Sequence, residues 1–104
     1  MYYTYILRCE DNSLYTGIAT DVQRRFEEHL NDEKKGAKYT KRHKPVKIEA
    51  YWESEDKKLV SKLEYHIKAL DKHKKEILIK ENRLDLLGDR IDSNNYKRIM
   101  LTKQ

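Results

Sequence analysis

Two short β-forming segments separated by a tight turn begin this chain, and they restrict its fold more than any other feature. Residues 2–9 are rich in tyrosine, isoleucine and leucine, which favour strands. Residues 14–18 form a second such run, and Asp11-Asn12-Ser13 between them is a turn sequence. Because so few residues separate the two segments, we expect an antiparallel hairpin here.

A helix is expected directly after this hairpin, beginning at Thr20 or Asp21. Thr20 and Gln23 have the spacing of a capping box. An apolar stripe recurs at every fourth position, at Val22, Phe26 and Leu30. Arg25 and His29 form a parallel row with the same spacing, so both side chains can point the same way.

The rest of the chain alternates between strand and helix patterns. After a loop-like stretch at residues 31–45, residues 46–53 alternate between apolar and polar side chains, which predicts a strand with one buried face. Its buried positions are expected to be Val46, Ile48, Ala50 and Trp52. Ser54 is expected to cap the next helix, and Asp71 a further helix that ends at Ile79. The core stripe of the first of these helices comprises Leu59, Leu63, Ile67 and Leu70.

The predicted element order is β-β-α-β-α-α, which indicates an α+β fold. We expect a small three-stranded sheet flanked by helices, because the apolar helix stripes need a surface to cover. The length of 104 residues suits one domain. We assign residues 1–82 to this domain and residues 83–104 to a C-terminal extension that forms a short helix or a frayed tail.

The charge of the chain favours a polyanionic partner. The formal net charge is +5, which favours binding to nucleic acid or to an anionic membrane face. No apolar run approaches the roughly 20 residues that span a bilayer, and we expect no signal peptide. The single cysteine, Cys9, is expected to be a small buried strand residue rather than a nucleophile. Because one cysteine allows no internal disulfide, we expect a cytoplasmic protein.

A basic segment follows the first predicted helix. Residues 34–47 contain no acidic residue, and Tyr39 lies among their cations. These cations are Lys34, Lys35, Lys38, Lys41, Arg42, Lys44 and Lys47. Such a segment is often only a solvated loop, but the lack of acids and a ring that can stack on a base favour contact with nucleic acid.

The residue types around the hairpin suit phosphodiester hydrolysis. Tyr5 and Tyr15 lie on neighbouring strands, and Gly17 is on the same face as Tyr15, where it allows another group to approach the backbone. A phenol is a poor base at its usual pKa of about 10, but a nearby cation favours the phenolate. An arginine can hold phosphate oxygens in a bidentate fork, and composition alone does not choose between Arg24 and Arg25.

Glu64 is the candidate metal ligand. It lies beside Leu63, next to a core stripe, and is therefore less solvated than an average surface glutamate. A carboxylate can bind one hard divalent cation that keeps several waters, and the cation neutralises charge in the transition state. The spacing of His43, His66 and His73 does not indicate a metal cluster.

Several of these positions together resemble the GIY-YIG nuclease superfamily. Its members carry a Gly-Ile-Tyr-like triplet and then a Tyr-Ile-Gly-like triplet, which Tyr3-Thr4-Tyr5 and Tyr15-Thr16-Gly17 resemble. Arg25, His29 and Glu64 then follow at the spacing of the family. The resemblance extends from residue 2 to about residue 80. It is greatest to small bacterial single-domain (UPF0213-like) members, which share the stretches at residues 11–17, 36–40 and 63–68.

The resemblance implies a metal-dependent endonuclease that acts on DNA or another nucleic acid, with one weakly bound Mg²⁺ or Mn²⁺ at Glu64. It implies that Tyr15 is the general base, that Tyr5 helps to place the water and that Arg25 binds the phosphate. His29 is either an auxiliary site residue or a hydrogen-bonded support. Many larger relatives carry an asparagine in a Pro-x-Tyr-Asn run after the glutamate, and this sequence lacks that run.

Three classes of function remain open: a metal-dependent endonuclease, a nucleic-acid binding module without significant catalysis, and a protein-interaction domain. The intact set of Tyr5, Tyr15, Arg25 and Glu64 favours the first over the second. The basic segment disfavours the third. We therefore expect nucleic acid as the partner, with DNA favoured, no protein partner, no membrane, and a monomer.

Overall fold

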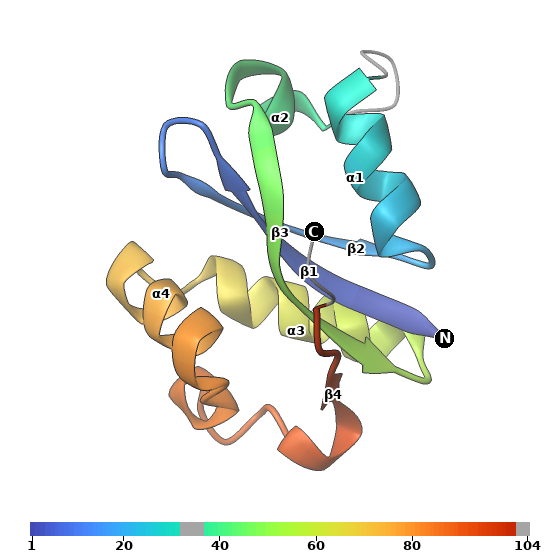
Figure 1. Cartoon of the computed structure of the whole chain (residues 1–104). Helices are drawn as coiled ribbons and strands as arrows, with labels where there is room; N and C mark the ends of the chain where they lie inside the picture. The colour runs from blue at the N-terminus through green and yellow to red at the C-terminus, as the bar shows by residue number, and fades with distance from the viewer. Residues whose placement is uncertain (32–36, 102–104) are drawn as a thin grey trace.

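An antiparallel sheet forms the centre of the protein (Figure 1). A computed structural model describes residues 1–31 and 37–101 of the chain. The sheet order is β2-β1-β3-β4, so the expected three-stranded sheet was wrong by one strand. The strands are β1 (Tyr2–Cys9), β2 (Leu14–Ala19), β3 (Pro45–Ser54) and β4 (Lys97–Arg98). The missed strand is only two residues long, too short for any sequence pattern to reveal.

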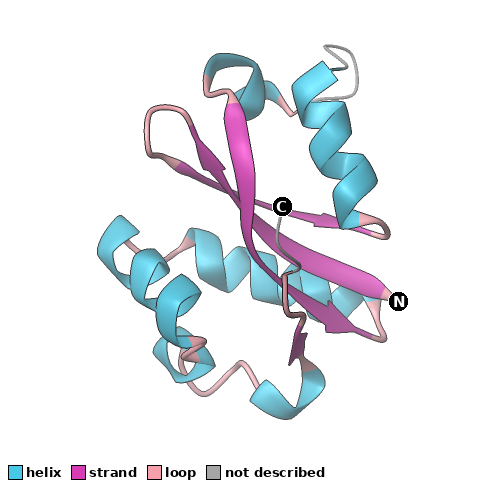
Figure 2. Cartoon of the chain, viewed as in Figure 1, coloured by secondary structure: helices cyan, strands magenta, loops and turns pink. Residues whose placement is uncertain are grey.

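Two groups of helices cover opposite sides of this sheet (Figure 2). On one side lie α1 (Val22–Asn31) and α2 (Lys38–Arg42), and on the other lie α3 (Lys57–Lys68) and α4 (Lys72–Glu81). Two 3₁₀ turns, η1 (Leu84–Leu87) and η2 (Ser93–Asn95), precede β4. The α+β class is confirmed, but the predicted order lacked α2, the 3₁₀ turns and β4. No helix in the described ranges is long and apolar enough to cross a bilayer.

The expected hairpin is present. Strands β1 and β2 pair antiparallel, with Tyr5 opposite Gly17. In the turn, Asn12 has a φ of 68°, a left-handed conformation that asparagine tolerates better than most residues. The backbone N–H of Cys9 donates to the carbonyl of Ser13 at 2.9 Å and closes the turn.

The burial of β3 differs from the prediction because its pairing with β1 contains two irregularities. In the first, the consecutive residues Ile6 and Leu7 of β1 pair with Ala50 and Ile48. Glu49 is left without a partner on β1 and is therefore the extra residue of a β-bulge. An extra residue reverses the face to which the preceding side chains point. Ile48 therefore faces the opposite side from Ala50 and Trp52, and Val46, beside the second irregularity, is 50% exposed.

The core consists of two clusters of buried side chains. The larger one joins the sheet to α3, α4 and the C-terminal segment, through Ile6, Ala50, Trp52, Leu63, Ile67, Leu78, Leu84, Leu87, Ile91 and Tyr96. The smaller one joins the sheet to α1, through Tyr5, Leu7, Val22, Phe26 and Ile48. Residues beyond position 82 thus contribute to the larger cluster, while the division of the chain at that position stays a prediction.

Aspartates cap α1, α3 and α4. Asp71 caps α4 as predicted, accepting a backbone N–H at 2.8 Å. Asp21, rather than Thr20, accepts a backbone N–H of α1 at 3.0 Å. Asp56, rather than Ser54, caps α3. Ser54 is instead the last residue of β3, and its hydroxyl donates to the carbonyl of Asn95 at 2.7 Å, which fastens η2 to the sheet.

Candidate active site

Tyr5 lies at the centre of the α1 side of the sheet and depends on Gly17 for its position. Its side chain is 1% exposed, and its ring lies against the backbone of Gly17 on the neighbouring strand. A Cβ at residue 17 would lie 2.5 Å from the hydroxyl oxygen of Tyr5 and 2.6 Å from Cζ. Only glycine leaves this space free, so the second triplet of the motif accommodates the tyrosine of the first.

His29 is buried between the sheet and α2, and both of its ring nitrogens are engaged. Nε2 lies 2.8 Å from the hydroxyl oxygen of Tyr5, and Nδ1 lies 2.8 Å from Oγ1 of Thr40. Burial lowers the pKa of His29 to about 4, and the positive charge of Arg25 acts in the same direction. The imidazole is therefore neutral near neutral pH, and its contacts favour the role of hydrogen-bonded support.

Arg25, and not Arg24, faces the tyrosines. Arg24 is exposed, whereas the side chain of Arg25 is 26% exposed. Arg25 donates a hydrogen bond to Glu28 at 3.1 Å, and its positive charge lowers the pKa of Tyr5. Its guanidinium is therefore close enough to act on the buried phenol and still reaches solvent.

Tyr15 is half-buried on β2, beside Tyr5 and His29. Its ring centroid lies 6.3 Å from that of Tyr5 and 5.3 Å from that of His29. Burial raises its pKa, the positive charge of Arg25 lowers it, and the negative charge of Glu64 raises it. Within the described ranges, no hydrogen bond joins the Tyr15 hydroxyl to another residue. Tyr5 is thus held by His29, while the hydroxyl of Tyr15 has no such partner among the described residues.

Glu64 reaches this site from α3. Its negative charge raises the pKa of both Tyr5 and Tyr15. This approach is possible because β2 is an edge strand, against which α3 packs. Glu64 is paired with Lys68, one turn further along α3, at 3.5 Å. The Lys68 ammonium also lies 5.8 Å from the centre of the Tyr15 ring.

The donor set around Glu64 fits a hydrated divalent ion better than a tightly coordinated one. Among the described residues, no group of three or more His, Cys, Asp or Glu side chains is placed to hold a metal. Mg²⁺ tolerates this, since it usually keeps several waters and binds one or two carboxylates. A single glutamate thus suits one weakly held ion.

The basic segment is partly helical rather than a loop. Lys34 and Lys35 lie outside the described residues. Exposed cations on or next to α2 are Lys38, Lys41, Arg42 and Lys44. Tyr39 stacks on His43 at 4.2 Å between ring centroids and lies 5.7 Å from the ring of Tyr15. A pocket of about 350 Å³ opens between Lys38, Tyr39, Arg42 and His43. Tyr39, one of the predicted nucleic-acid contacts on α2, therefore lies directly beside the ring of Tyr15.

Two residues of this site were not predicted. Thr40 is 4% exposed and holds His29, and its only sequence signal was the shared stretch at residues 36–40. Lys68 was detectable from its position four residues after Glu64, the spacing of a helical ion pair.

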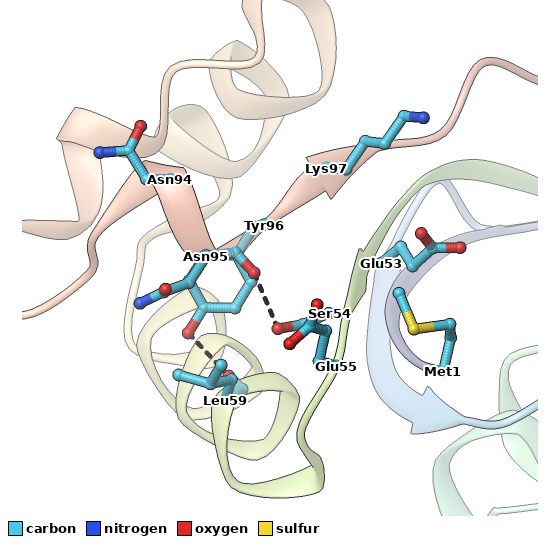
Figure 3. A pocket seen from close by; sticks show the side chains of 9 residues that line it. All are labelled: Met1, Glu53, Ser54, Glu55, Leu59, Asn94, Asn95, Tyr96 and Lys97. Carbon is cyan, nitrogen blue, oxygen red and sulfur yellow. Dashed lines mark hydrogen bonds between the residues drawn. The ribbon is translucent and has the colours of Figure 1, made fainter.

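A second pocket lies elsewhere, between the end of β3, the start of α3 and η2 (Figure 3). Its volume is about 300 Å³, and none of the predicted site residues lines it. One wall is held by Tyr96, whose hydroxyl donates to the carbonyl of Leu59 at 2.8 Å. This pocket is separate from the candidate active site.

Comparison with known proteins identifies the family. The family described as "GIY-YIG catalytic domain" matches residues 1–77. The chain belongs to the GIY-YIG family. A UPF0213 protein of Fusobacterium nucleatum is 53% identical over 78 residues, which cover 75% of this chain and 76% of that protein. A UPF0213 protein of Halalkalibacterium halodurans is 44% identical over 78 residues, which cover 75% and 81% of the two chains.

A solved structure shares the GIY-YIG fold of this chain. The solution NMR structure of a UPF0213 protein from Bacillus halodurans superposes with a TM-score of 0.50 at 37% sequence identity. The match covers 88% of this chain and 98% of that one. The predicted membership in the GIY-YIG superfamily, among its UPF0213 members, is therefore confirmed. The names of these relatives state no activity.

Proposed function

We propose that this protein is a divalent-metal-dependent endonuclease that hydrolyses phosphodiester bonds in nucleic acid, with DNA favoured. Nucleases are typical of its family. The observation that carries the proposal is the convergence of four groups: the rings of Tyr5 and Tyr15 lie 6.3 Å apart, the charge of Arg25 acts on both of them, and the Lys68 partner of Glu64 lies 5.8 Å from the ring of Tyr15. Hydrolysis needs a base, a phosphate-binding cation and a metal ligand, and this cluster contains each of them.

The contacts of each side chain suggest its role in the reaction. Arg25 would bind the scissile phosphate, because its guanidinium is partly exposed beside both phenols. Tyr15 would accept the proton of the attacking water as the phenolate, which the charge of Arg25 and of a divalent ion nearby would favour. Tyr5, held by His29, would help to place this water. A divalent ion bound at Glu64, as Mg²⁺ or Mn²⁺, would supply positive charge against the transition state.

The cations of α2 would bind the nucleic-acid backbone next to this chemistry. The proposed contact set is Lys34, Lys35, Lys38, Tyr39, Lys41, Arg42 and Lys44. The positive charges would provide sequence-independent phosphate contacts, and Tyr39 would stack on a base. The alternative function is a nucleic-acid binding module of the same fold without significant catalysis. It is favoured by the burial that raises the pKa of Tyr5 and Tyr15, and by the missing Pro-x-Tyr-Asn run.

Cleavage of a panel of branched, single-stranded and duplex DNA and of RNA, with Mg²⁺ or Mn²⁺, tests the proposal. Tyr15→Phe should retain fold and binding but lose turnover, because it removes only the hydroxyl. Tyr65→Phe, at a tyrosine 71% exposed on α3, is the matched control and should cleave like the wild type. Binding without cleavage of any substrate would favour the binding module. Cleavage that survives both Tyr15→Phe and Glu64→Gln would indicate a contaminating nuclease.

Arg25 and Glu64 should act as one unit. Each of Arg25→Ala and Glu64→Gln should lower kcat by about 10²–10³, the size seen when one charge-stabilising group is removed from a site. The double variant should lose little more than either single variant. Arg24→Ala is the control for Arg25, since Arg24 is exposed on the same helix. Fully multiplicative losses would contradict a shared role.

The ion itself is testable without turnover. Titration with Mg²⁺ should shift the NMR signals of Glu64, Tyr15 and Arg25 together, with weak affinity because one carboxylate supplies little charge. Glu64→Gln should abolish these shifts. Shifts confined to other regions would place the ion elsewhere.

A further inference from the structure

A chain of hydrogen bonds runs from Thr40 on α2 through His29 to the buried Tyr5. The carbonyl of Ala37, which can only accept, decides which atom donates in each of these bonds. Oγ1 of Thr40 lies 2.9 Å from the carbonyl oxygen of Ala37 and 2.8 Å from Nδ1 of His29. A carbonyl oxygen has no proton, so Thr40 donates its single hydroxyl proton to Ala37. Toward His29 the same oxygen can then only accept. Nδ1 of His29 therefore carries the ring proton.

The remaining nitrogen of the ring is then an acceptor. His29 is neutral, because burial holds its pKa at about 4. Nε2 therefore has a free lone pair, and the hydroxyl of Tyr5 at 2.8 Å must donate to it. The oxygen of Tyr5 keeps its own lone pairs, and the nearby positive charge of Arg25 lowers the pKa of this phenol. The hydrogen bond between Tyr5 and His29 thus has a defined direction, from Tyr5 to His29.

The opposite tautomer satisfies fewer groups. The backbone N–H of Ala37 lies 3.3 Å from Nδ1, a longer contact that suits an unprotonated Nδ1. In that arrangement the carbonyl of Ala37 keeps the backbone N–H of Lys41 at 3.2 Å, so Thr40 can donate to Nδ1. The hydroxyl proton of Tyr5, however, loses Nε2 as its acceptor at a residue that is 1% exposed, whereas the arrangement with the proton on Nδ1 costs only the longer bond from the partly exposed backbone N–H of Ala37. Since an unpaired buried polar group is unfavourable, the arrangement with the proton on Nδ1 prevails.

We propose that Thr40 is a positioning residue: it selects the tautomer of His29 and thereby directs the hydroxyl proton of Tyr5 toward His29, away from the substrate. Its consequence for catalysis rests on the proposed nuclease function. With the proton of Tyr5 committed to His29, Tyr15 is left as the tyrosine that meets the substrate. Thr40 belongs to α2, which lies in the basic segment. The same residue therefore joins this helix to His29 and, through His29, to Tyr5.

Nitrogen NMR of the His29 ring tests this assignment without any need for activity. In the wild type, Nδ1 should show the shift of a protonated ring nitrogen and Nε2 that of an acceptor. Thr40→Val keeps the shape but removes the acceptor for Nδ1–H, so the tautomer should reverse, with Nδ1 accepting from Ala37. Thr40→Ser should restore the wild-type pattern. A wild-type ring protonated on Nε2, or a tautomer that is unchanged in Thr40→Val, would overturn the proposal.

Thr4→Val is the matched control. Thr4 is also a fully buried threonine, and its hydroxyl donates to the carbonyl of Val60 at 2.7 Å, on α3. This variant loses a comparable bond but should leave the His29 nitrogens at their wild-type shifts. A reversed tautomer in Thr4→Val would show a general response to lost stability and would overturn the specific role of Thr40.

Kinetics then separate this inference from the proposed function. Thr40→Val should lower kcat by about 10–100-fold, the range typical when a partner that orients a site histidine is lost, with KM changed little. Thr40→Ser should recover most of that loss. If the wild type cleaves nothing, the proposed function fails while the ring shifts still decide the role of Thr40. If the tautomer reverses but kcat is unchanged, the catalytic consequence is overturned.

Discussion

The two sides of the sheet are stabilised in different ways. Toward α3 and α4 the apolar cluster is the larger one, with Trp52, Leu63 and Ile67 completely buried, and the buried hydroxyls there, of Thr4 and Ser54, each donate to a backbone carbonyl. Toward α1 and α2 the apolar cluster is smaller, and buried polar side chains such as His29 and Thr40 lie beside it. Within the described ranges, no buried side-chain nitrogen or oxygen lacks a hydrogen-bond partner. The α3 side therefore depends mainly on buried apolar area, and the α1 side depends also on the direction of the hydrogen bonds between side chains.

This difference teaches why so small a protein can contain a polar site at its centre. A polar cluster contributes little net stability, because each hydrogen bond replaces one with water. The apolar side must therefore supply most of the stability that keeps the polar side ordered. Substitutions on the α3 side should change the free energy of unfolding, and those on the α1 side should change the site geometry. The following predictions test that division, from the largest expected effect to the smallest.

Trp52→Ala should lower the free energy of unfolding by about 3–5 kcal/mol, the usual loss for a buried aromatic residue. It removes the centre of the apolar cluster and the hydrogen bond from Nε1 to Asn82, which is 2.9 Å long. Urea unfolding measures this effect. Tyr65→Ala, at an exposed aromatic position, should change it by less than about 0.5 kcal/mol. Similar losses for the two variants would contradict the importance of the apolar side.

His29 should make stability depend on pH. Its pKa is lowered from 6.5 to about 4 in the folded protein, so the unfolded chain binds this proton more readily. Stability should be complete above pH 6.5 and should fall as the pH drops toward about 4, by on the order of 3 kcal/mol. Unfolding by urea at several pH values should show this fall in the wild type, and the fall should be smaller in His29→Gln. His73→Gln, on the exposed face of α4, should keep the wild-type dependence.

Gly17→Ala should lower the free energy of unfolding by about 1–3 kcal/mol, the range for an overpacked core position. The new methyl group would collide with the hydroxyl and ring of Tyr5. NMR should therefore show displaced signals for Tyr5 and His29. Gly88→Ala is the control, since it strains a backbone with a φ of 87° but meets no atom within 4 Å. That variant should leave the signals of Tyr5 and His29 in place even if it also lowers stability.

Replacing the three exposed cations of α2 should leave stability nearly unchanged but weaken binding. The change of Lys38, Lys41 and Arg42 to alanine should reduce the slope of log affinity against log salt on duplex DNA by two to three units at most, since each lost contact removes about 0.9. Fluorescence anisotropy at several salt concentrations measures the slope. The same change at Lys72, Lys74 and Lys80 of α4 should have no such effect. A wild-type slope in the α2 variant would exclude this helix as the contact surface.

Local physical chemistry explains which parts were predictable from sequence. Turn residues, apolar periodicity and caps act over a few positions, so the hairpin, the helix at α1 and the Asp71 cap followed from the sequence. The spacing of Tyr5, Tyr15 and Arg25 indicated the family for the same reason, because these residues lie on consecutive elements.

The remaining features depend on contacts between distant residues. The extra residue Glu49 is defined only by the pairing of β3 with β1, and it moved Ile48 to the opposite side of the sheet. Ser54 matched a cap by its type, but its carbonyl partner, Asn95, lies 41 residues away. β4 exists only because its two residues pair with the end of β3.

By itself, then, the sequence determined the hairpin, the main helices, the family and the set of residues available for chemistry. Tertiary structure decided which of these residues meet and in what direction their hydrogen bonds run. It turned Arg25 rather than Arg24 inward, brought the Glu64–Lys68 pair to the ring of Tyr15 and placed Thr40 against His29. The physical reason is burial: a polar group removed from water must find a partner inside the fold, and the packing of separate elements decides which partner is within reach.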